Sequence, residues 1–179
     1  MSDFLERMER LKVSAQSPDR CVTAKFTITT GVEVKLAAST VRRHTEESLA
    51  EQVTAAVNGV FAGCRQGTRA ALSRPETDKD QPGNPQREAA VRQRRFAHEV
   101  SEMETQAISP LGCAAAWLVG EGTFHLQIAP GTLHRLDVDD ARLQREINNA
   151  IAVAMREHAA WKRQVHEHVY QYQPYGSDE

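Results

Sequence analysis

Seven histidines and three cysteines are the residues of this chain that could bind a metal ion or act as nucleophiles. No two histidines stand four residues apart, the spacing that places an imidazole pair on one face of a helix. His166 and His168 would point to different sides of a helix. The cysteines, Cys21, Cys64 and Cys113, show no Cys-x-x-Cys spacing. We therefore predict no metal site and histidines that lie on the solvated surface.

The motifs of common enzyme classes are also missing from the sequence. The chain has no glycine loop ending in Gly-Lys-Ser/Thr, no Gly-x-Ser-x-Gly and no His-Glu-x-x-His. No histidine stands in a local signature that would activate a cysteine. We predict a protein that is not an enzyme and uses no cofactor.

Arginine is the one unusual charge signal. Of the 22 basic residues, 17 are Arg and 5 are Lys. Guanidinium groups bind phosphates and carboxylates with two hydrogen bonds, so this bias suits anion recognition. The alternative is a GC-rich genome that encodes Arg in place of Lys on solvated helix faces. The arginines that cluster are Arg42, Arg43, Arg65, Arg69, Arg74, Arg92, Arg94 and Arg95.

The overall charge hides an uneven distribution. The formal net charge of −2 and a pI near 6.4 remove the simplest argument for nucleic-acid binding, a strongly basic domain. Residues 1–75 carry 11 basic and 8 acidic side chains, residues 76–86 carry 1 and 3, and residues 87–179 carry 10 and 13. The sequence has no apolar run of about 18 residues and its start is too charged for a signal peptide. We expect a soluble, cytoplasmic protein with no membrane partner.

The sequence contains an internal repeat, in which similar residues recur after 92 positions. Residues 17–21, Ser-Pro-Asp-Arg-Cys, recur at 109–113 as Ser-Pro-Leu-Gly-Cys. Val32, Val34 and Leu36 recur as Phe124, Leu126 and Ile128. After a two-residue insertion the spacing becomes 94, and the matched positions are Leu49, Val53, Ala56 and Val57 with Leu143, Ile147, Ala150 and Ile151. An ordered series of this kind indicates an internal duplication.

Each copy is predicted to run from a helix through strands to a long helix. In the first copy, 3.6-residue periodicity predicts a helix over 3–14, and alternating apolar residues predict strands over 22–28 and 32–36 with a turn at Thr30-Gly31. Thr45 is the expected N-cap of a helix that continues to about Leu72. In the second copy we expect a helix over 87–105, strands near 113–119 and 123–129, and a helix from Asp139 to about Val169.

These elements define the predicted domains. Residues 1–74 form the first repeat, the proline-containing residues 75–86 a flexible linker, residues 87–169 the second repeat, and residues 170–179 a tail. The tail is either extended or held to the body by its tyrosines. Cys21 and Cys113 take the same place in the two repeats, either as small buried apolar side chains or as a disulfide.

A single repeat has too little core to be stable alone, so the fold class we predict is α+β, with the two repeats packed on each other as an intrachain pseudo-dimer. Ala55, Gly59, Gly63, Gly67 and Ala71 recur every four residues and form a stripe of small residues on the first long helix. We expect Val153 and Trp161 of the second long helix to fill this stripe. The alternative is a helix break near Gly63–Gly67.

The repeat plan resembles the YbaB/EbfC family of nucleoid-associated DNA-binding proteins. The residues that carry the resemblance are 17–19, 22–28, 31–36 and 45–60, which recur as 109–112, 122–131, 135–140 and 147–154. The resemblance implies a tweezer-like dimer, located in the nucleoid, whose protruding helices contact double-stranded DNA with little sequence preference. Family members usually have one copy and dimerise, so this chain would be a monomeric pseudo-dimer or a further homodimer. The phosphate contacts would come from Arg42, Arg43, Arg65, Arg69, Arg92, Arg94 and Arg95.

A second class of function remains open on the same resemblance. Related actinobacterial proteins accompany type VII secretion systems, which implies a protein-interaction adaptor without DNA binding. The adaptor requires an exposed apolar patch, whereas DNA binding requires the arginines on one face.

Overall fold

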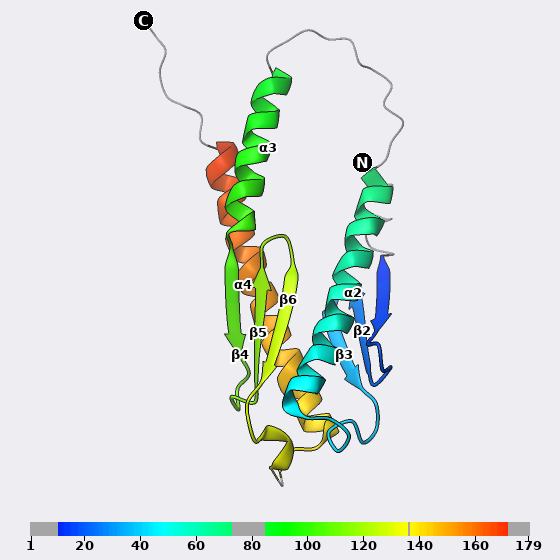
Figure 1. The fold of residues 1–179 in the computed structure, drawn as a ribbon. Helices are drawn as coiled ribbons and strands as arrows, with labels where there is room; N and C mark the ends of the chain where they lie inside the picture. Colours follow the sequence, from blue (N-terminus) through cyan, green and yellow to red (C-terminus); the bar gives the residue numbers. More distant parts are fainter. Residues whose placement is uncertain (1–10, 73–84, 136, 172–179) are drawn as a thin grey trace, which may run out of the picture.

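The computed structural model describes residues 11–72, 85–135 and 137–171; within the helices, the side chains of 69–72, 85–88 and 171 lie outside the description. Its main elements are β1 (Lys12–Gln16), β2 (Val22–Thr27), β3 (Gly31–Leu36), α2 (Glu46–Leu72), α3 (Pro85–Ser101), β4 (Glu104–Ile108), β5 (Ala114–Val119), β6 (Thr123–Ile128) and α4 (Asp140–Gln171). The strands form two antiparallel sheets, β1-β2-β3 and β4-β5-β6. The α+β class is therefore confirmed (Figure 1).

The predicted hairpins are confirmed, and their alternating sequences explain them. In β2 and β3, Val22, Ala24, Val32 and Val34 are buried, whereas Lys25 and Glu33 are exposed. Gly31 has a φ of 71°, a left-handed conformation that glycine adopts at no steric cost, and it ends the turn between the strands. β5 and β6 repeat this arrangement, with Ala116 opposite Leu126 as Ala24 is opposite Val34.

Two predicted helices are wrong in part. Residues 12–14, the end of the helix that we predicted over 3–14, belong to β1, and residues 3–10 lie outside the described residues. Likewise α3 ends at Ser101, and Glu104 and Thr105 belong to β4 instead of the predicted helix over 87–105. In both places a third strand pairs with the first strand of the hairpin and satisfies its backbone groups.

Both long helices begin as predicted. The hydroxyl and carbonyl oxygens of Thr45 accept from the N–H groups of Ser48 and Leu49, which makes Thr45 the N-cap of α2. Asp139 caps α4 in the same way, through Arg142 and Leu143. α2 runs unbroken to Leu72, so the alternative of a break near Gly63–Gly67 is wrong.

The stripe of small residues on α2 faces β1, not α4. A Cβ at Gly59, Gly63 or Gly67 would lie 2.8, 2.5 and 2.8 Å from side-chain atoms of Ala15, Val13 and Leu11. The prediction that Val153 and Trp161 fill the stripe is therefore wrong, and Trp161 is 44% exposed. The glycines instead let α2 lie directly on the strand that the sequence analysis missed.

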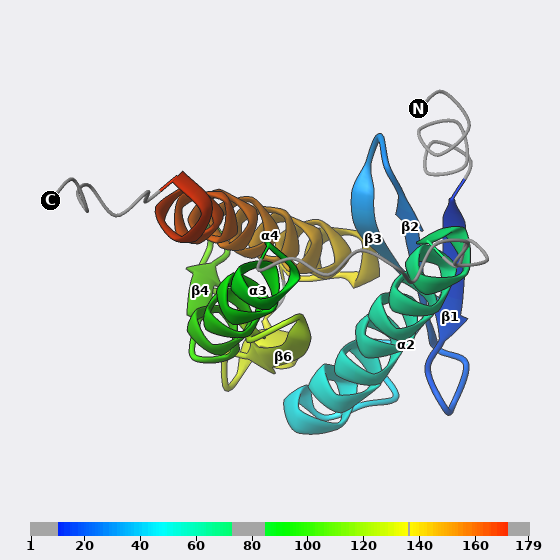
Figure 2. The ribbon, with the colours of Figure 1, turned by 90° about the horizontal axis from the view of Figure 1, so that it is seen from above.

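Each long helix packs on its own sheet and also on the edge of the other sheet. α2 contacts β1 and β2 and lies along β6, and α4 contacts β4 and β5 and lies along β3. Their buried side chains, including Val53, Val57, Ile147 and Ile151, belong to one hydrophobic core that the two sheets share. Seen from above in Figure 2, α2 and α4 diverge from this shared region toward opposite sides of the molecule.

Side-chain amides hold the two exposed sheet edges. Asn148 of α4 accepts the N–H of Val34 at 2.7 Å and donates to its carbonyl at 2.9 Å, so that it acts like one more residue of a strand. Asn58 of α2 makes the same pair of bonds to Phe124 of β6, both at 2.9 Å. Helix side chains therefore satisfy the edge of β3 at Val34 and the edge of β6 at Phe124.

The elements separate into a base and two arms (Figure 1). The base contains the loops 37–45 and 129–139 and the N-terminal parts of α2 and α4. The first arm is the C-terminal part of α2 with β1, and the second arm is α3 packed on the C-terminal part of α4. The arms stand on opposite sides of the molecule and extend in the same direction from the base.

Candidate nucleic-acid interface

Two of the seven predicted DNA-binding arginines lie in the base. Arg42 and Arg43 belong to the loop between β3 and α2 and are both exposed. The guanidinium of Arg43 donates to the carbonyl oxygens of Ala38 at 2.9 Å and Ser39 at 3.3 Å. Ser39 has a φ of 61°, so Arg43 stabilises a tight loop. The structure does not bring these two arginines together with those of the arms.

The first arm carries Arg65 and Arg69. Arg65 is exposed and lines a cavity of about 350 Å³ between α2 and the β5–β6 turn, together with Phe61, Cys64, Thr68 and Glu121. Its guanidinium extends toward Gly122 of that turn. Arg69 follows one helical turn later, but its side chain lies outside the described residues.

The second arm carries Arg92, Arg94 and Arg95 on α3. Arg94 and Arg95 are exposed, and Arg92 is half-buried. Arg95 pairs with Glu99 one turn further along, with a nitrogen–oxygen distance of 3.0 Å. An exposed pair of this kind contributes little to stability, so the guanidinium can exchange Glu99 for another anion at small cost.

Charge is divided between the base and the arms. Residues 59–72 of α2 hold two arginines and no acidic residue, α3 holds four arginines and two glutamates, and residues 156–171 of α4 hold three basic and two acidic residues. By contrast, residues 46–58 hold three glutamates and no basic residue. The loops 37–45 and 129–139 and residues 140–155 add five arginines and four acidic residues, so the base as a whole holds five basic and seven acidic side chains. Each arm therefore carries a net positive charge, and the base carries a weak net negative charge.

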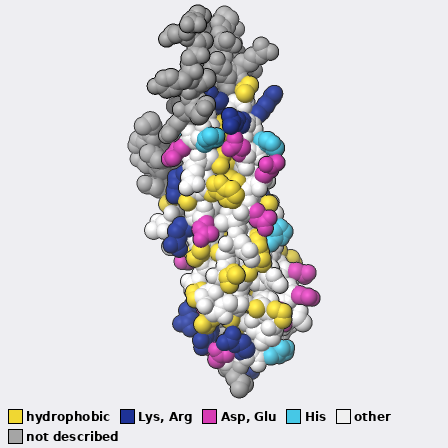
Figure 3. Space-filling model, turned by 90° about the vertical axis from the view of Figure 1, so that its left-hand side faces the viewer, with side chains coloured by type: hydrophobic (Ala, Val, Ile, Leu, Met, Phe, Trp, Pro, Cys, Tyr) yellow, Lys and Arg dark blue, Asp and Glu magenta, His cyan; other side chains and the backbone are white. Residues whose placement is uncertain are grey.

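Exposed apolar side chains lie along the left-hand side of the molecule as drawn in Figure 1. Figure 3 shows this face, with apolar side chains scattered down its middle and charged groups on both flanks. Among the described residues from 85 onward, the large apolar side chains that are more than a third exposed are Val91 on α3, Ile108 at the end of β4, Leu111 in the β4–β5 loop, and Trp161 and Tyr170 on α4. Tyr170 stacks on His166 with ring centres 4.5 Å apart, and Phe96 packs against both rings.

Asp19, Cys21 and His44 form a cluster that sequence reasoning missed. Their ligand-type atoms lie within 4.8 Å of one another. The Asp19 carboxylate accepts from the Ser17 hydroxyl at 2.7 Å and from the Cys21 N–H at 3.0 Å, and it lies 3.1 Å from His44 Nε2. These residues are up to 25 positions apart in no recognised motif, so the sequence held no signal for them.

The cluster closes the turn between β1 and β2. Burial and the neighbouring Asp19 raise the pKa of the Cys21 thiol to about 11, so the thiol stays protonated at neutral pH. The positive charge of Arg43 also acts on this thiol and disfavours a further cation beside it. Cys21 and Cys113 are both buried free thiols, as the first of the two alternatives predicted.

Asp19 should make the stability of the protein depend on acid pH. Burial would raise its pKa, but the bonds from Cys21 and Ser17 and the charge of His44 outweigh burial and lower the pKa from 3.8 to about 2. Because the folded protein holds this proton less tightly than the unfolded chain, the stabilisation is complete above pH 3.8 and is lost as the pH falls through about 2.

Urea unfolding at a series of pH values should show a smaller loss of the free energy of unfolding in this window for Asp19→Asn than for the wild type. Glu33→Gln, at an exposed position, is the control. An unchanged loss in Asp19→Asn would contradict the assignment.

No family model, curated protein or solved structure matches the chain. No helix in the described part of the chain is long and apolar enough to cross a membrane.

Proposed function

We propose that the protein is a non-enzymatic, nucleoid-associated DNA-binding protein with little sequence preference, and that its two arms contact the duplex. The observation that carries the proposal is the net positive charge of the helices of the arms, which hold nine basic and four acidic side chains, above a base that holds five basic and seven acidic ones. Phosphate contacts need guanidinium groups that are exposed and able to leave weak internal partners, which describes Arg65, Arg94 and Arg95. The resemblance to the YbaB/EbfC family supports the same function.

The proposal narrows the set of DNA-binding arginines. Arg65, Arg69, Arg92, Arg94 and Arg95 all lie on the arms and stay in the proposed interface. Arg42 and Arg43 lie in the base, and Arg43 is bonded to its own loop. We assign Arg43 to loop structure, and we leave Arg42 out of the proposed interface because it lies in the base, away from the arms.

Two tandem repeats forming an intrachain pseudo-dimer would supply the arms. Three observations support this arrangement. β4, β5 and β6 begin 92 residues after β1, β2 and β3, and α4 begins 94 residues after α2. The edge contact of Thr54 with Leu126 has the counterpart Asn148 with Val34. The bond of Glu46 to the Leu133 N–H has the counterpart Asp140 to the Val41 N–H.

A gel-shift titration with a random-sequence duplex tests the proposed function. At about 50 mM salt, where phosphate contacts are strong, we expect a shift at micromolar protein. An unrelated duplex should compete equally well, because phosphate contacts carry no sequence information. Absence of a shift at micromolar protein would refute DNA binding.

The exposed apolar side chains of α3, β4 and α4 favour one other function, a protein-interaction adaptor such as an accessory protein of a type VII secretion system. Val91 and Ile108 are 61% and 62% exposed, so their apolar surface is open to a partner protein. Recovery of a stoichiometric protein partner by the wild type, but not by Ile108→Asp, would support this function. Recovery of nucleic acid alone would contradict it.

A further inference from the structure

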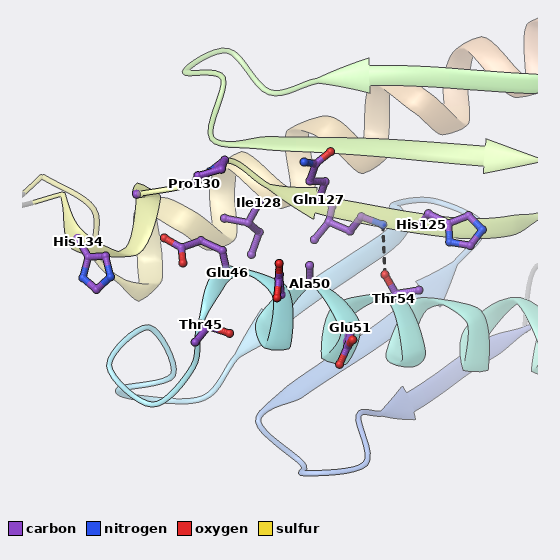
Figure 4. A pocket seen from close by; sticks show the side chains of 13 residues that line it. Thr45, Glu46, Ala50, Glu51, Thr54, His125, Gln127, Ile128, Pro130 and His134 are labelled. Atoms are coloured by element: carbon purple, nitrogen blue, oxygen red, sulfur yellow. Dashed lines mark hydrogen bonds between the residues drawn. The ribbon is translucent and has the colours of Figure 1, made fainter.

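A pocket in the base separates α2 from the edge of β6 (Figure 4). Its volume is about 660 Å³, within the range of pockets that bind small ligands. Ala50 and Ile128 face each other across it, and Pro130 and Leu126 add apolar surface. The polar side chains that line it are Thr45, Glu46, Glu47, Glu51, Thr54, His125, Gln127 and His134.

The pocket is larger than the corresponding cavity in the other half of the molecule, of about 370 Å³, because the two repeats differ at one position. In the other half of the molecule, Gln144 of α4 reaches the edge of β3, and its side-chain oxygen accepts the Leu36 N–H at 3.0 Å. With the spacings of 94 and 92, Gln144 corresponds to Ala50 and Leu36 corresponds to Ile128. Ala50 has no polar side chain, so the space that Gln144 fills on one side is empty on the other.

The missing side chain leaves the N–H of Ile128 in β6 without a partner. The N–H of Ala129 bonds to Cys113, and antiparallel pairing alternates, so the N–H and C=O of Ile128 point away from β5 toward the pocket. Asn58 pairs with both the N–H and the C=O of Phe124, and the Thr54 hydroxyl accepts the N–H of Leu126. Among the described residues, none forms a hydrogen bond with the N–H or the C=O of Ile128 on the side that faces the pocket. A peptide group of a ligand can supply both a donor and an acceptor here.

The charge around the pocket selects a basic ligand. Glu47 and Glu51 stand one helical turn apart on α2 and both are exposed. Their counterparts on α4 are Ala141 and Arg145, and the corresponding smaller cavity, of about 370 Å³, is lined by two lysines, Lys25 and Lys35, and one acidic residue, Glu33. Of these two cavities, only the pocket between α2 and β6 is therefore acidic. The carboxylate of Glu46 accepts the Leu133 N–H at 3.2 Å, so we do not count Glu46 among the groups that contact the ligand.

We propose that this pocket binds a basic peptide segment of a partner protein. One peptide group of the segment pairs with the backbone of Ile128, and an arginine side chain lies beside Glu47 and Glu51. The site is separate from the proposed DNA interface, because it lies in the base and its charge repels phosphate. It therefore adds a second, protein-binding function that does not depend on DNA binding.

The natural counterpart provides the test variant. Ala50→Gln reproduces Gln144, so its side chain should fill the pocket, satisfy the Ile128 N–H and leave the fold intact. The probe is a blocked pentapeptide, Gly-Gly-Arg-Gly-Gly, and its control contains citrulline, which has the shape of arginine without the charge. Binding is measured by amide NMR shifts of the ¹⁵N-labelled full chain, up to about 10 mM peptide to include weak binding.

We expect the arginine peptide to shift the amide signals of Ala50, Glu51 and Ile128 with saturation. Citrulline in place of arginine, or Glu47→Gln with Glu51→Gln, should weaken binding about fivefold, since the charge pair is exposed. Ala50→Gln should abolish binding and keep the gel shift with duplex. Lack of saturable shifts, equal binding of the citrulline peptide, or unchanged binding to Ala50→Gln would each overturn the proposal. So would a wild-type dimer in sedimentation that Ala50→Gln dissolves, because the pocket would then hold a second copy of this chain.

Discussion

Leucine in place of Gly63 should lower the free energy of unfolding by about 3 kcal/mol, because it forces α2 away from β1. Even the Cβ of residue 63 would lie 2.5 Å from Val13 Cγ1, closer than real Cβ atoms approach other atoms. Val13 cannot move aside easily, since a β-branched side chain in a strand has few rotamers. The gain in helix propensity on replacing glycine, about 1 kcal/mol, is smaller than this cost.

Ala62→Leu is the matched control for this variant. Ala62 precedes Gly63 on α2 and is exposed, so a leucine there should change stability little. Chemical unfolding measures both. A free energy of unfolding of Gly63→Leu equal to that of the wild type would contradict the packing of α2 on β1.

A double-mutant cycle identifies the residue that Gly63 contacts. Gly63→Ala alone should destabilise the protein, because its methyl group meets Val13. In a Val13→Ala background the Cγ1 atom is gone, and Gly63→Ala should instead stabilise by up to about 1 kcal/mol through helix propensity. Equal effects of Gly63→Ala in both backgrounds would show that Val13 is not the contact.

Asn148→Ala and Asn58→Ala should each cost about 2 kcal/mol, because each leaves an N–H and a C=O of a sheet edge without partners. The two sites lie on different sheets and share no partner. Their effects should therefore add in the double variant, to about 4 kcal/mol.

Asn149→Ala is the control for the asparagine variants, because Asn149 is adjacent to Asn148 but exposed. It should change the free energy of unfolding by less than about 0.5 kcal/mol. If Asn148→Ala were no more destabilising than Asn149→Ala, the helix side chains would not close the sheet edges as described.

The elements with strong local signals could be predicted from the sequence. Alternation identified β2, β3, β5 and β6, and the caps at Thr45 and Asp139 placed the starts of the long helices to within a residue. β1 and β4 were missed because they are short and come directly after segments whose apolar residues have helical spacing. Leu11, Val13 and Ala15 do alternate, and this was the available signal.

Tertiary contacts could not be predicted in the same way. The glycines of α2 correctly indicated a close approach of another chain segment, but sequence spacing does not say which segment approaches. β1 takes that place because it extends the sheet on which α2 already packs. For the same reason the sequence identified arginines by type and could not separate Arg42 and Arg43 in the base from those on the arms.

The pocket of the base could be found only by comparing the two repeats. Ala50 is an unremarkable helix residue until it is aligned with Gln144 and the bond of Gln144 to Leu36 is known. The Asp19 cluster likewise depends on a loop that brings His44 to the β1–β2 turn.

The salt dependence of duplex binding tests most directly whether the arms hold DNA. Fluorescence anisotropy with a labelled random duplex gives the slope of log affinity against log salt for the wild type and three variants. Arg65→Ala and Arg94→Ala should each reduce the slope by about 0.9, the value for one lost phosphate contact, and Arg42→Ala should leave it unchanged. Equal slopes for all four proteins, or a reduction in Arg42→Ala alone, would contradict the proposed interface.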